Sequence, residues 1–393
     1  MARGAASVPP AAAPLLRDPR VRSIIWQVIL LAAVAAVAAA LAWAAAKNLA
    51  RSNVASGFGF WNETAGFDIS QTLIDYSSST STYGRAFWVG LLNTLLVAAI
   101  GIVLATIVGF VVGIARLSSN WLVARLAAGY VQLVRNVPLL LQLLFWYNAV
   151  LKTLPGFRDS IHLWGGGFLN NRGLVLPAPD LGGNGRLVLG ALGVGLAGAV
   201  ALALLARRQW LAARIAAIVG LVLVLGLPLA AFLASGAKLT FEFPEMSRFN
   251  LRGGMEVLPE FVALVTGLVI YTGAFIAETV RAGLLAVPRG QTEAAQALGL
   301  SRLVTLRRVI VPQAMRVIIP PLTNQYLNLT KNSSLAVAIG YPDLVQIFTG
   351  TVLNQTGQAV EIVAITMAVY LVISLVTSLL MNVYNARMAL AER

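Results

Sequence analysis

Long, uninterrupted apolar runs constrain this chain more than any other feature of its sequence. A bilayer core of about 30 Å needs about 20 helical residues, because each residue advances an α-helix by about 1.5 Å. About eight runs approach this length, although the third is short and Pro320-Pro321 interrupts the seventh: 24–46, 87–115, 137–154, 187–206, 215–235, 261–280, 309–339 and 359–381. We therefore predict an all-α, polytopic membrane protein with about eight transmembrane helices.

The composition supports a membrane protein and argues against metal chemistry. Hydrophobic residues make up 58% of the 393 residues, charged residues only 11%, and the mean hydropathy is +0.80. A soluble core of this size does not need so much apolar sequence. The chain has no Cys and a single histidine, His162, so it lacks the usual ligands of a thiolate or imidazole metal site. We expect no metal and no cofactor in this chain.

The net charge of +14 raises nucleic acid as a partner, but membrane topology explains most of it. If the N-terminus is cytoplasmic, about 17 Lys and Arg fall in inner segments and about 10 in the longer outer loops. Eight spans then place the C-terminus in the cytoplasm as well. We expect the run 24–46 to be an uncleaved anchor. The alternative is a cleaved signal peptide, because the sequence AWAAA resembles a cleavage site.

The segment EAAQALGLSRLVTLRRVIVP, residues 293–312, predicts a hairpin of two short helices between the sixth and seventh spans. Residues 291–298 are good helix formers, Gly299 suits a left-handed turn, and Ser301 can cap the next helix. Pro312 is expected to end that second helix.

Two functions share this helix-turn-helix pattern. DNA-binding hairpins have it, and a membrane-tethered regulator is the remote alternative. However, the flanking spans hold the hairpin within a few residues of the bilayer, which prevents a helix from entering a major groove about 8.5 Å deep.

The spacing of Glu293-Ala294-Ala295, Gly299 and Val309-x-Val311-Pro312 resembles the EAA loop of ATP-binding-cassette (ABC) importer permeases, with Val309 and Val311 in place of Ile and Leu. The stretches RNVPLLLQLLFWY (135–147), ETVRAGLLAVPRGQTEAAQALGLS (278–301) and KNSSLAVAIGYPDL (331–344) look like the polar amino acid branch of that family. The similarity covers 87–150 and 258 to the C-terminus. The length of the chain and its additional spans resemble the Q-type permease of general L-amino acid importers.

This resemblance implies a type I ABC importer permease core of five helices, with three additional helices. The domain division is then residues 1–86, comprising a cytoplasmic tail, an anchor and an outer loop, followed by a permease domain over 87–393. The permease domain would contain an inserted hairpin at about 187–235 and a cytoplasmic coupling loop at 281–312. The residues implied in contacting an ATPase subunit are Gln291, Thr292, Glu293, Ala294, Ala295, Ala297, Gly299, Leu300 and Ser301.

The chain would be a transport subunit of the bacterial inner membrane and not an enzyme. It has no GxxxxGK[ST] sequence, so ATP and Mg²⁺ would be bound by a separate ATPase. Its longest outer loop, 47–86, is too short for a solute-binding domain. The implied partners are a dimeric ATPase, a second, homologous permease, a periplasmic amino acid binding protein, the amino acid substrate and membrane lipid.

Polar residues inside the predicted spans indicate a substrate pathway, because such residues are costly unless they face a cavity or a partner helix. Asn324, Asn328 and Lys331 recur at helical spacing and should share one face. Lys331 could meet a substrate carboxylate or a carboxylate of the partner permease. The full set of pathway candidates is Gln142, Tyr147, Thr272, Asn324, Asn328, Lys331 and Ser334.

Three further patterns have structural interpretations. Glu278 and Arg281 are spaced to form an ion pair at the inner end of the sixth span. Small residues every four positions, Gly101, Ala105, Gly109 and Gly113, predict a close helix contact with an unspecified partner. Residues 121–134 could form an amphipathic helix at the membrane surface.

A secondary transporter driven by an ion gradient remains the alternative function. Such carriers usually place carboxylates or histidines at mid-membrane, whereas the only well-embedded ionisable residue here is Lys331.

Overall fold

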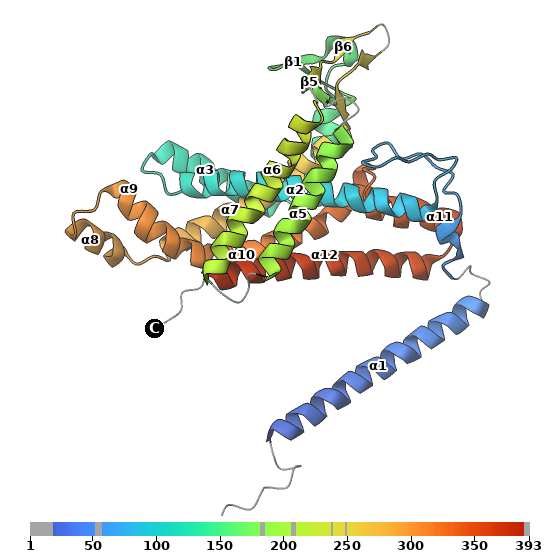
Figure 1. Ribbon diagram of the computed structural model, residues 1–393, viewed down its shortest axis with the longest axis horizontal. Coiled ribbons are helices and arrows are strands. Elements are labelled where there is room, and N and C mark those ends of the chain that lie inside the picture. Colours follow the sequence, from blue (N-terminus) through green and yellow to red (C-terminus); the bar gives the residue numbers. More distant parts are fainter. Residues whose placement is uncertain are drawn as a thin grey trace, which may run out of the picture.

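The computed structural model describes residues 19–51, 57–180, 185–205, 210–236, 239–247 and 250–388 (Figure 1). Each of the eight predicted apolar runs forms helix within these ranges. The long helices are α1 (Pro19–Arg51), α2 (Tyr83–Ala115), α3 (Trp121–Asn136), α5 (Gly185–Leu205), α6 (Trp210–Ala234), α7 (Pro259–Leu285), α10 (Val311–Asn332) and α12 (Ala359–Met388). The predicted anchor, 24–46, lies within α1, whereas residues 1–18 of the predicted cytoplasmic tail lie outside the described part.

Shorter helical segments connect these helices. They are η2 (Gly59–Asn62), α4 (Leu139–Leu144), the π-helix η3 (Phe145–Leu151), η4 (Phe157–Asp159), α8 (Arg289–Ala297), α9 (Arg302–Thr305), the π-helix η7 (Leu306–Ile310), η8 (Ser333–Ile339), the π-helix η9 (Gln346–Val352) and α11 (Leu353–Thr356).

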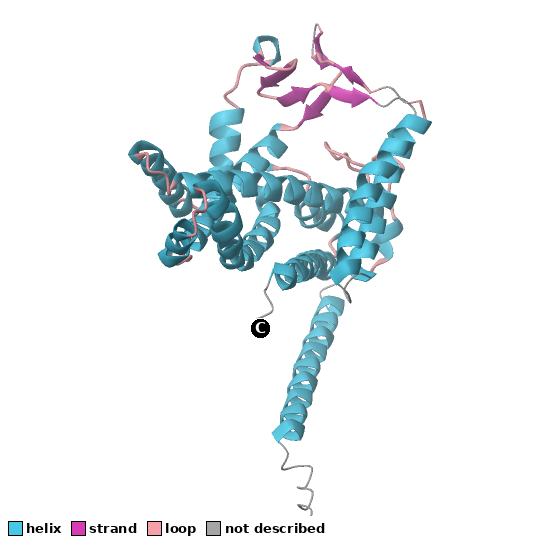
Figure 2. Ribbon diagram, turned by 60° about the vertical axis from the view of Figure 1, so that its left-hand side comes forward, coloured by secondary structure: helices cyan, strands magenta, loops and turns pink. Residues whose placement is uncertain are grey.

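Short strands, which the sequence did not predict, lie in the two loops that flank the α5–α6 pair (Figure 2). β1 (Ile161–Leu163), β2 (Gly167–Asn170), β3 (Gly173–Leu176) and β8 (Met255–Val257) form an antiparallel sheet in the order β1-β2-β3-β8. β4 (Ala178–Asp180) pairs with β5 (Thr240–Glu242), and β6 (Glu245–Met246) pairs with β7 (Leu251–Arg252). Strands of two to four residues are too short to show the alternation of apolar and polar residues by which a strand is predicted from sequence.

Within the described residues, α2, α7 and residues 359–383 of α12 are long and apolar enough to cross a membrane. α3 and the α4–η3 segment are together long and apolar enough for a fourth span, but they are bent by 105° where they meet, as in a broken span or a re-entrant loop. One face of α3, which contains the predicted amphipathic segment 121–134, packs on α7 through Val131 and Val134 against Ala274 and Ala277, and most of its other residues are exposed. Pro138 lies at the bend, where its missing amide makes a continuous helix unfavourable.

The small-residue stripe of α2 packs against helices of the same chain, and all four of its residues are buried. Gly109 faces Ile276 and the carbonyl of Gly273, and Gly113 faces Ala277 and Val280 of α7. The two helices can approach closely because the glycines of α2 have no side chain at this contact. The stripe therefore holds the long helices of the bundle together.

The α5–α6 pair forms a hairpin outside this bundle. The two helices pack along one another, and Gly195 lies against the backbone of Leu223 and Val224. Figure 1 shows the hairpin at a steep angle to α2 and α12. Leu221, Leu225 and other large apolar side chains on its outer surface are exposed, as expected for contact with lipid.

The helix that follows the predicted turn does not end at Pro312. α9, η7 and α10 are consecutive, and the π-helical segment precedes the proline. The N–H of Val311 donates to the carbonyl of Leu306, five residues back. The helix therefore already departs from the usual i→i−4 hydrogen bonds just before Pro312. Pro312 has no N–H to donate, so it can be accommodated there without ending the helix. The expected helix end at Pro312 is therefore wrong, and the hairpin is continuous with α10.

Candidate functional site

The hairpin between α7 and α10 has the predicted helix-glycine-helix geometry. Gly299 follows α8 with φ +74°, its N–H donates to the carbonyl of Gln296 at 2.9 Å, and the N–H of Leu300 donates to the carbonyl of Ala295 at 3.1 Å. These two bonds form a Schellman motif, which requires a left-handed residue at the position of Gly299. Ser301 then caps α9 by accepting the N–H of Val304 at 3.4 Å.

Most of the coupling-loop candidates lie on the exposed side of α8. Glu293, Ala294 and Ala297 are exposed, whereas Thr292 is half-buried. Ala295, which the resemblance also implied as an ATPase contact, is only 4% exposed because it faces the inside of the hairpin. Gln291 accepts a hydrogen bond from Gln313 Nε2 at 3.1 Å, which ties α8 to the start of α10.

Two leucines at the tip of the hairpin were missed by the sequence analysis. Leu298 is 79% exposed and Leu303 is 74% exposed, on either side of Gly299. Arg302, Arg307 and Arg308 around them are also exposed. The signal in the sequence was the placement of large apolar residues next to a turn on an otherwise polar, basic segment. We call Leu298 and Leu303 the leucine tip.

The polar face of α10 has the predicted arrangement. Asn324, Asn328 and Lys331 are exposed, whereas Thr323 and Thr330 on the adjoining face are buried. Ser334 follows in η8 and donates to the carbonyl of Lys331 at 2.7 Å. The three exposed side chains thus form one polar stripe along the outside of this chain.

The remaining pathway candidates do not join this stripe. Gln142 is buried and donates to the carbonyls of Val134 and Val137, both at 2.9 Å, so it stabilises the bend between α3 and α4. Thr272 is buried inside α7. The hydroxyl of Tyr147 donates to Glu260 Oε1 at 2.6 Å, which connects η3 to the start of α7.

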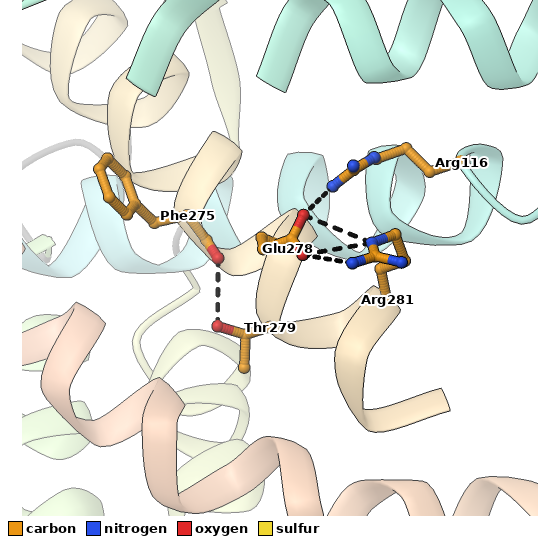
Figure 3. Close-up of polar contacts among 5 residues, drawn as sticks. All are labelled: Arg116, Phe275, Glu278, Thr279 and Arg281. Atoms are coloured by element: carbon orange, nitrogen blue, oxygen red, sulfur yellow. Dashed lines mark hydrogen bonds and ion pairs between the residues drawn. The ribbon is translucent and has the colours of Figure 1, made fainter. Parts of the chain in front are cut away.

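An ion-pair cluster lies at the hairpin end of α7 (Figure 3). Arg281 Nη2 is 2.6 Å from Glu278 Oε1, which confirms the predicted pair three residues apart. Arg116, directly after α2, bonds to the other carboxylate oxygen of Glu278. Arg116 was not predicted as a partner, because local spacing cannot show a residue 162 positions away. The cluster connects the end of α2 to α7.

We expect Glu278→Gln to weaken this connection. The change would leave two guanidiniums facing a neutral amide, and the partly buried site should lose about 1–2 kcal/mol of stability. Glu256→Gln is the control, because Glu256 is exposed on β8. Thermal unfolding of the purified protein in detergent would measure the difference. Equal melting temperatures for both variants would mean that the cluster is not stabilising.

Comparison with known proteins places the chain in a family. Residues 105–390 match the family described as "Binding-protein-dependent transport system inner membrane component". YhdX of Escherichia coli (strain K12) is 51% identical over 388 residues, which cover 96% of each chain. The "General L-amino acid transport system permease protein AapQ" of Rhizobium johnstonii is 51% identical over 386 residues, covering 96% of this chain and 94% of the relative.

A third relative is more distant but similarly complete. The "Glutamate/glutamine/aspartate/asparagine transport system permease protein BztB" of Rhodobacter capsulatus is 41% identical over 419 residues, covering 96% of each chain. The family match spans most of the chain, and the apolar helices are those of a multi-pass membrane protein. This chain therefore belongs to the inner membrane components of binding-protein-dependent transport systems, the permeases of ABC importers.

Proposed function

We propose that this chain is a permease subunit of an ATP-driven importer for L-amino acids, in which the α8–Gly299–α9 hairpin couples an ATPase to the membrane helices. The substrate class is supported by the relatives that carry general L-amino acid or glutamate/glutamine/aspartate/asparagine transport in their names. Their similarity extends over nearly the whole chain, including the segments outside the five-helix core.

The observation that carries the coupling role is the exposed hairpin with its leucine tip. Leu298 and Leu303 flank a well-defined turn, and large apolar side chains exposed in this way suit burial against a partner protein. Glu293 is exposed beside them and forms no ion pair within the described residues. It is therefore free to accept hydrogen bonds from an ATPase subunit.

The connection from the hairpin to the polar stripe supports the transmission of force. α9 continues through η7 into α10, and α10 carries Asn324, Asn328 and Lys331. A displacement of the hairpin would thus move the polar stripe directly, without a flexible linker. The ion pairs of Glu278 would carry the same movement to α2.

Transport then follows alternating access. ATP binding brings the two ATPase subunits together, the seated hairpins move with them, and the permease pair opens towards a loaded binding protein outside. Hydrolysis of ATP reverses the change. In this arrangement the hairpin and both chain termini face the cytoplasm, ATP and Mg²⁺ stay on the partner, and residues 187–235 form an inserted hairpin outside the permease core.

Purification of the complex and reconstitution in vesicles would test this function. We expect the chain to copurify with an ATPase and a second permease, and the vesicles to accumulate labelled L-amino acids only with ATP and a binding protein. Uptake that survives without ATP but stops when an ionophore dissipates the ion gradient would favour a secondary transporter. Retention of DNA by the 291–311 segment would favour a tethered regulator.

Lys331→Gln should lower uptake about tenfold if the ammonium group binds the substrate carboxylate, because a charge-assisted hydrogen bond contributes about 1.5–3 kcal/mol. Lys331 is exposed on the polar stripe. Lys47→Gln is the matched control, because Lys47 is an exposed lysine of α1. Uptake and subunit composition should be measured together. Loss of the partner permease from the purified complex would assign Lys331 to subunit pairing and not to substrate.

A further inference from the structure

Two adjoining cavities lie between α3, α7 and α10, close to the ion-pair cluster. Their volumes are about 390 Å³ and 280 Å³, and Arg135, Phe275 and Glu278 line both. The larger cavity is also lined by polar residues of α3, Gln132 and Asn136. The smaller one extends to Pro321 and Gln325 of α10. Small-molecule sites in proteins usually occupy about 300–1,000 Å³, so the pair is large enough for an amino acid.

Arg135 is the cationic side chain in these cavities that is available to bind an anion. Its guanidinium lies 4.9 Å from the centre of the Phe275 ring, and it forms no ion pair with any of the described residues. The carboxylate of Glu278 is already bonded by Arg116 and Arg281 (Figure 3). The wall of the larger cavity contains two guanidiniums, Arg116 and Arg135, and one carboxylate, Glu278, so it carries a net positive charge. Such a surface attracts an anion.

The cavities adjoin the polar stripe of α10. Pro321 precedes Asn324 by three residues, and Gln325 precedes Asn328 by three, so each pair lies on neighbouring turns of one helix. Lys331 is ten residues beyond Pro321, or about 15 Å along the helix axis. A solute that follows the stripe from Lys331 towards the hairpin would therefore meet Arg135 next.

We propose that these cavities form an inner subsite for the α-carboxylate of the transported amino acid, with Arg135 as its anchor. The proposal rests on the function proposed above. A guanidinium held over an aromatic ring presents its N–H fork to a planar carboxylate, and a bidentate contact of this kind fixes orientation as well as charge. The phosphate of an anionic lipid has similar chemistry, so the test must separate these two sources.

The absence of native cysteine makes a direct test possible. Gln132→Cys gives the chain a single thiol in the lining of the larger cavity and keeps Arg135, and Asn136→Cys gives an independent one if the first variant fails to assemble. The assembled transporter in phosphatidylcholine vesicles is treated with an anionic methanethiosulfonate reagent, and the labelling of this chain is read by mass spectrometry. We expect millimolar L-glutamine to slow labelling at least fivefold. Its decarboxylated analogue, 4-aminobutanamide, should not.

Arg125→Cys is the matched control, because Arg125 is an exposed arginine of the same helix and lines neither cavity. Its labelling should not respond to L-glutamine. Equal labelling of both cavity thiols with and without L-glutamine would overturn the proposal, as would equal protection by the decarboxylated analogue. Protection that appears only when phosphatidylglycerol is added to the vesicles, without L-glutamine, would assign the cavities to lipid.

Uptake by the wild-type complex separates this proposal from the proposed function. If the wild-type complex transports L-glutamine but neither cavity thiol is protected, the subsite is wrong and the permease function stands. If the wild-type complex moves no amino acid, the proposed function itself is wrong. Arg135→Lys should retain more uptake than Arg135→Gln, because a lysine keeps the charge but loses the bidentate fork.

Discussion

Gly299→Asp should abolish ATP-driven uptake and the association with an ATPase, while the chain itself still inserts in the membrane and folds. Gly299 has φ +74°, and a Cβ added there would meet no atom within 4 Å. The intrinsic cost of placing aspartate in this conformation is about 1 kcal/mol. At the centre of a docking surface, however, a buried extra carboxylate should cost about 2–4 kcal/mol, or about 30- to 1,000-fold in affinity.

Gly357→Asp provides a control of the same chemistry. Gly357 has φ +71°, a Cβ there would also meet no atom within 4 Å, and it lies between α11 and α12. Figure 1 shows α11 at the end of the bundle away from α8 and α9. Copurification of the ATPase and uptake in vesicles should be lost only in Gly299→Asp. If both variants behave alike, or if Gly299→Asp keeps full transport, the hairpin is not the coupling element.

The sequence predicted features that depend on neighbouring residues. The turn at Gly299, the cap at Ser301 and the pair of Glu278 with Arg281 follow from spacings of a few residues, and each is present in the structure. The polar stripe of α10 follows from helical periodicity alone. Apolar run length was enough to locate the long helices, because the hydrocarbon thickness sets a minimum for each one.

Features that depend on distant residues could not be predicted. The partner of the α2 stripe is α7, and nothing near Gly109 indicates Ile276, which is 167 residues away by numbering. The pairing of Arg116 with Glu278 could not be predicted for the same reason, because the two residues are 162 positions apart. The hydrogen bonds of Gln142 could not be predicted either, because a buried amide and a pathway amide look alike in sequence, and only the bend after α3 shows which carbonyls Gln142 binds.

Gly109→Leu should prevent the chain from forming a stable bundle. A Cβ at Gly109 would lie 2.4 Å from Ile276 Cγ2 and 3.1 Å from the carbonyl oxygen of Gly273, so α2 and α7 would have to separate. Overpacking usually costs about 1–3 kcal/mol, and a leucine at a helix contact built for glycine should exceed that range. We expect most of the variant to aggregate when it is extracted in mild detergent, as measured by fluorescence-detected size exclusion.

Gly129→Leu is the matched control for this change. Gly129 lies in α3, is exposed, and would present its Cβ to open space. It should therefore extract as a single species, because leucine is a better helix former than glycine and its Cβ would meet no atom within 4 Å. An Ile276→Ala change combined with Gly109→Leu should recover part of the monodisperse protein, since it removes the side chain nearest to the new one. A monodisperse Gly109→Leu protein with the wild-type melting temperature would contradict the α2–α7 contact.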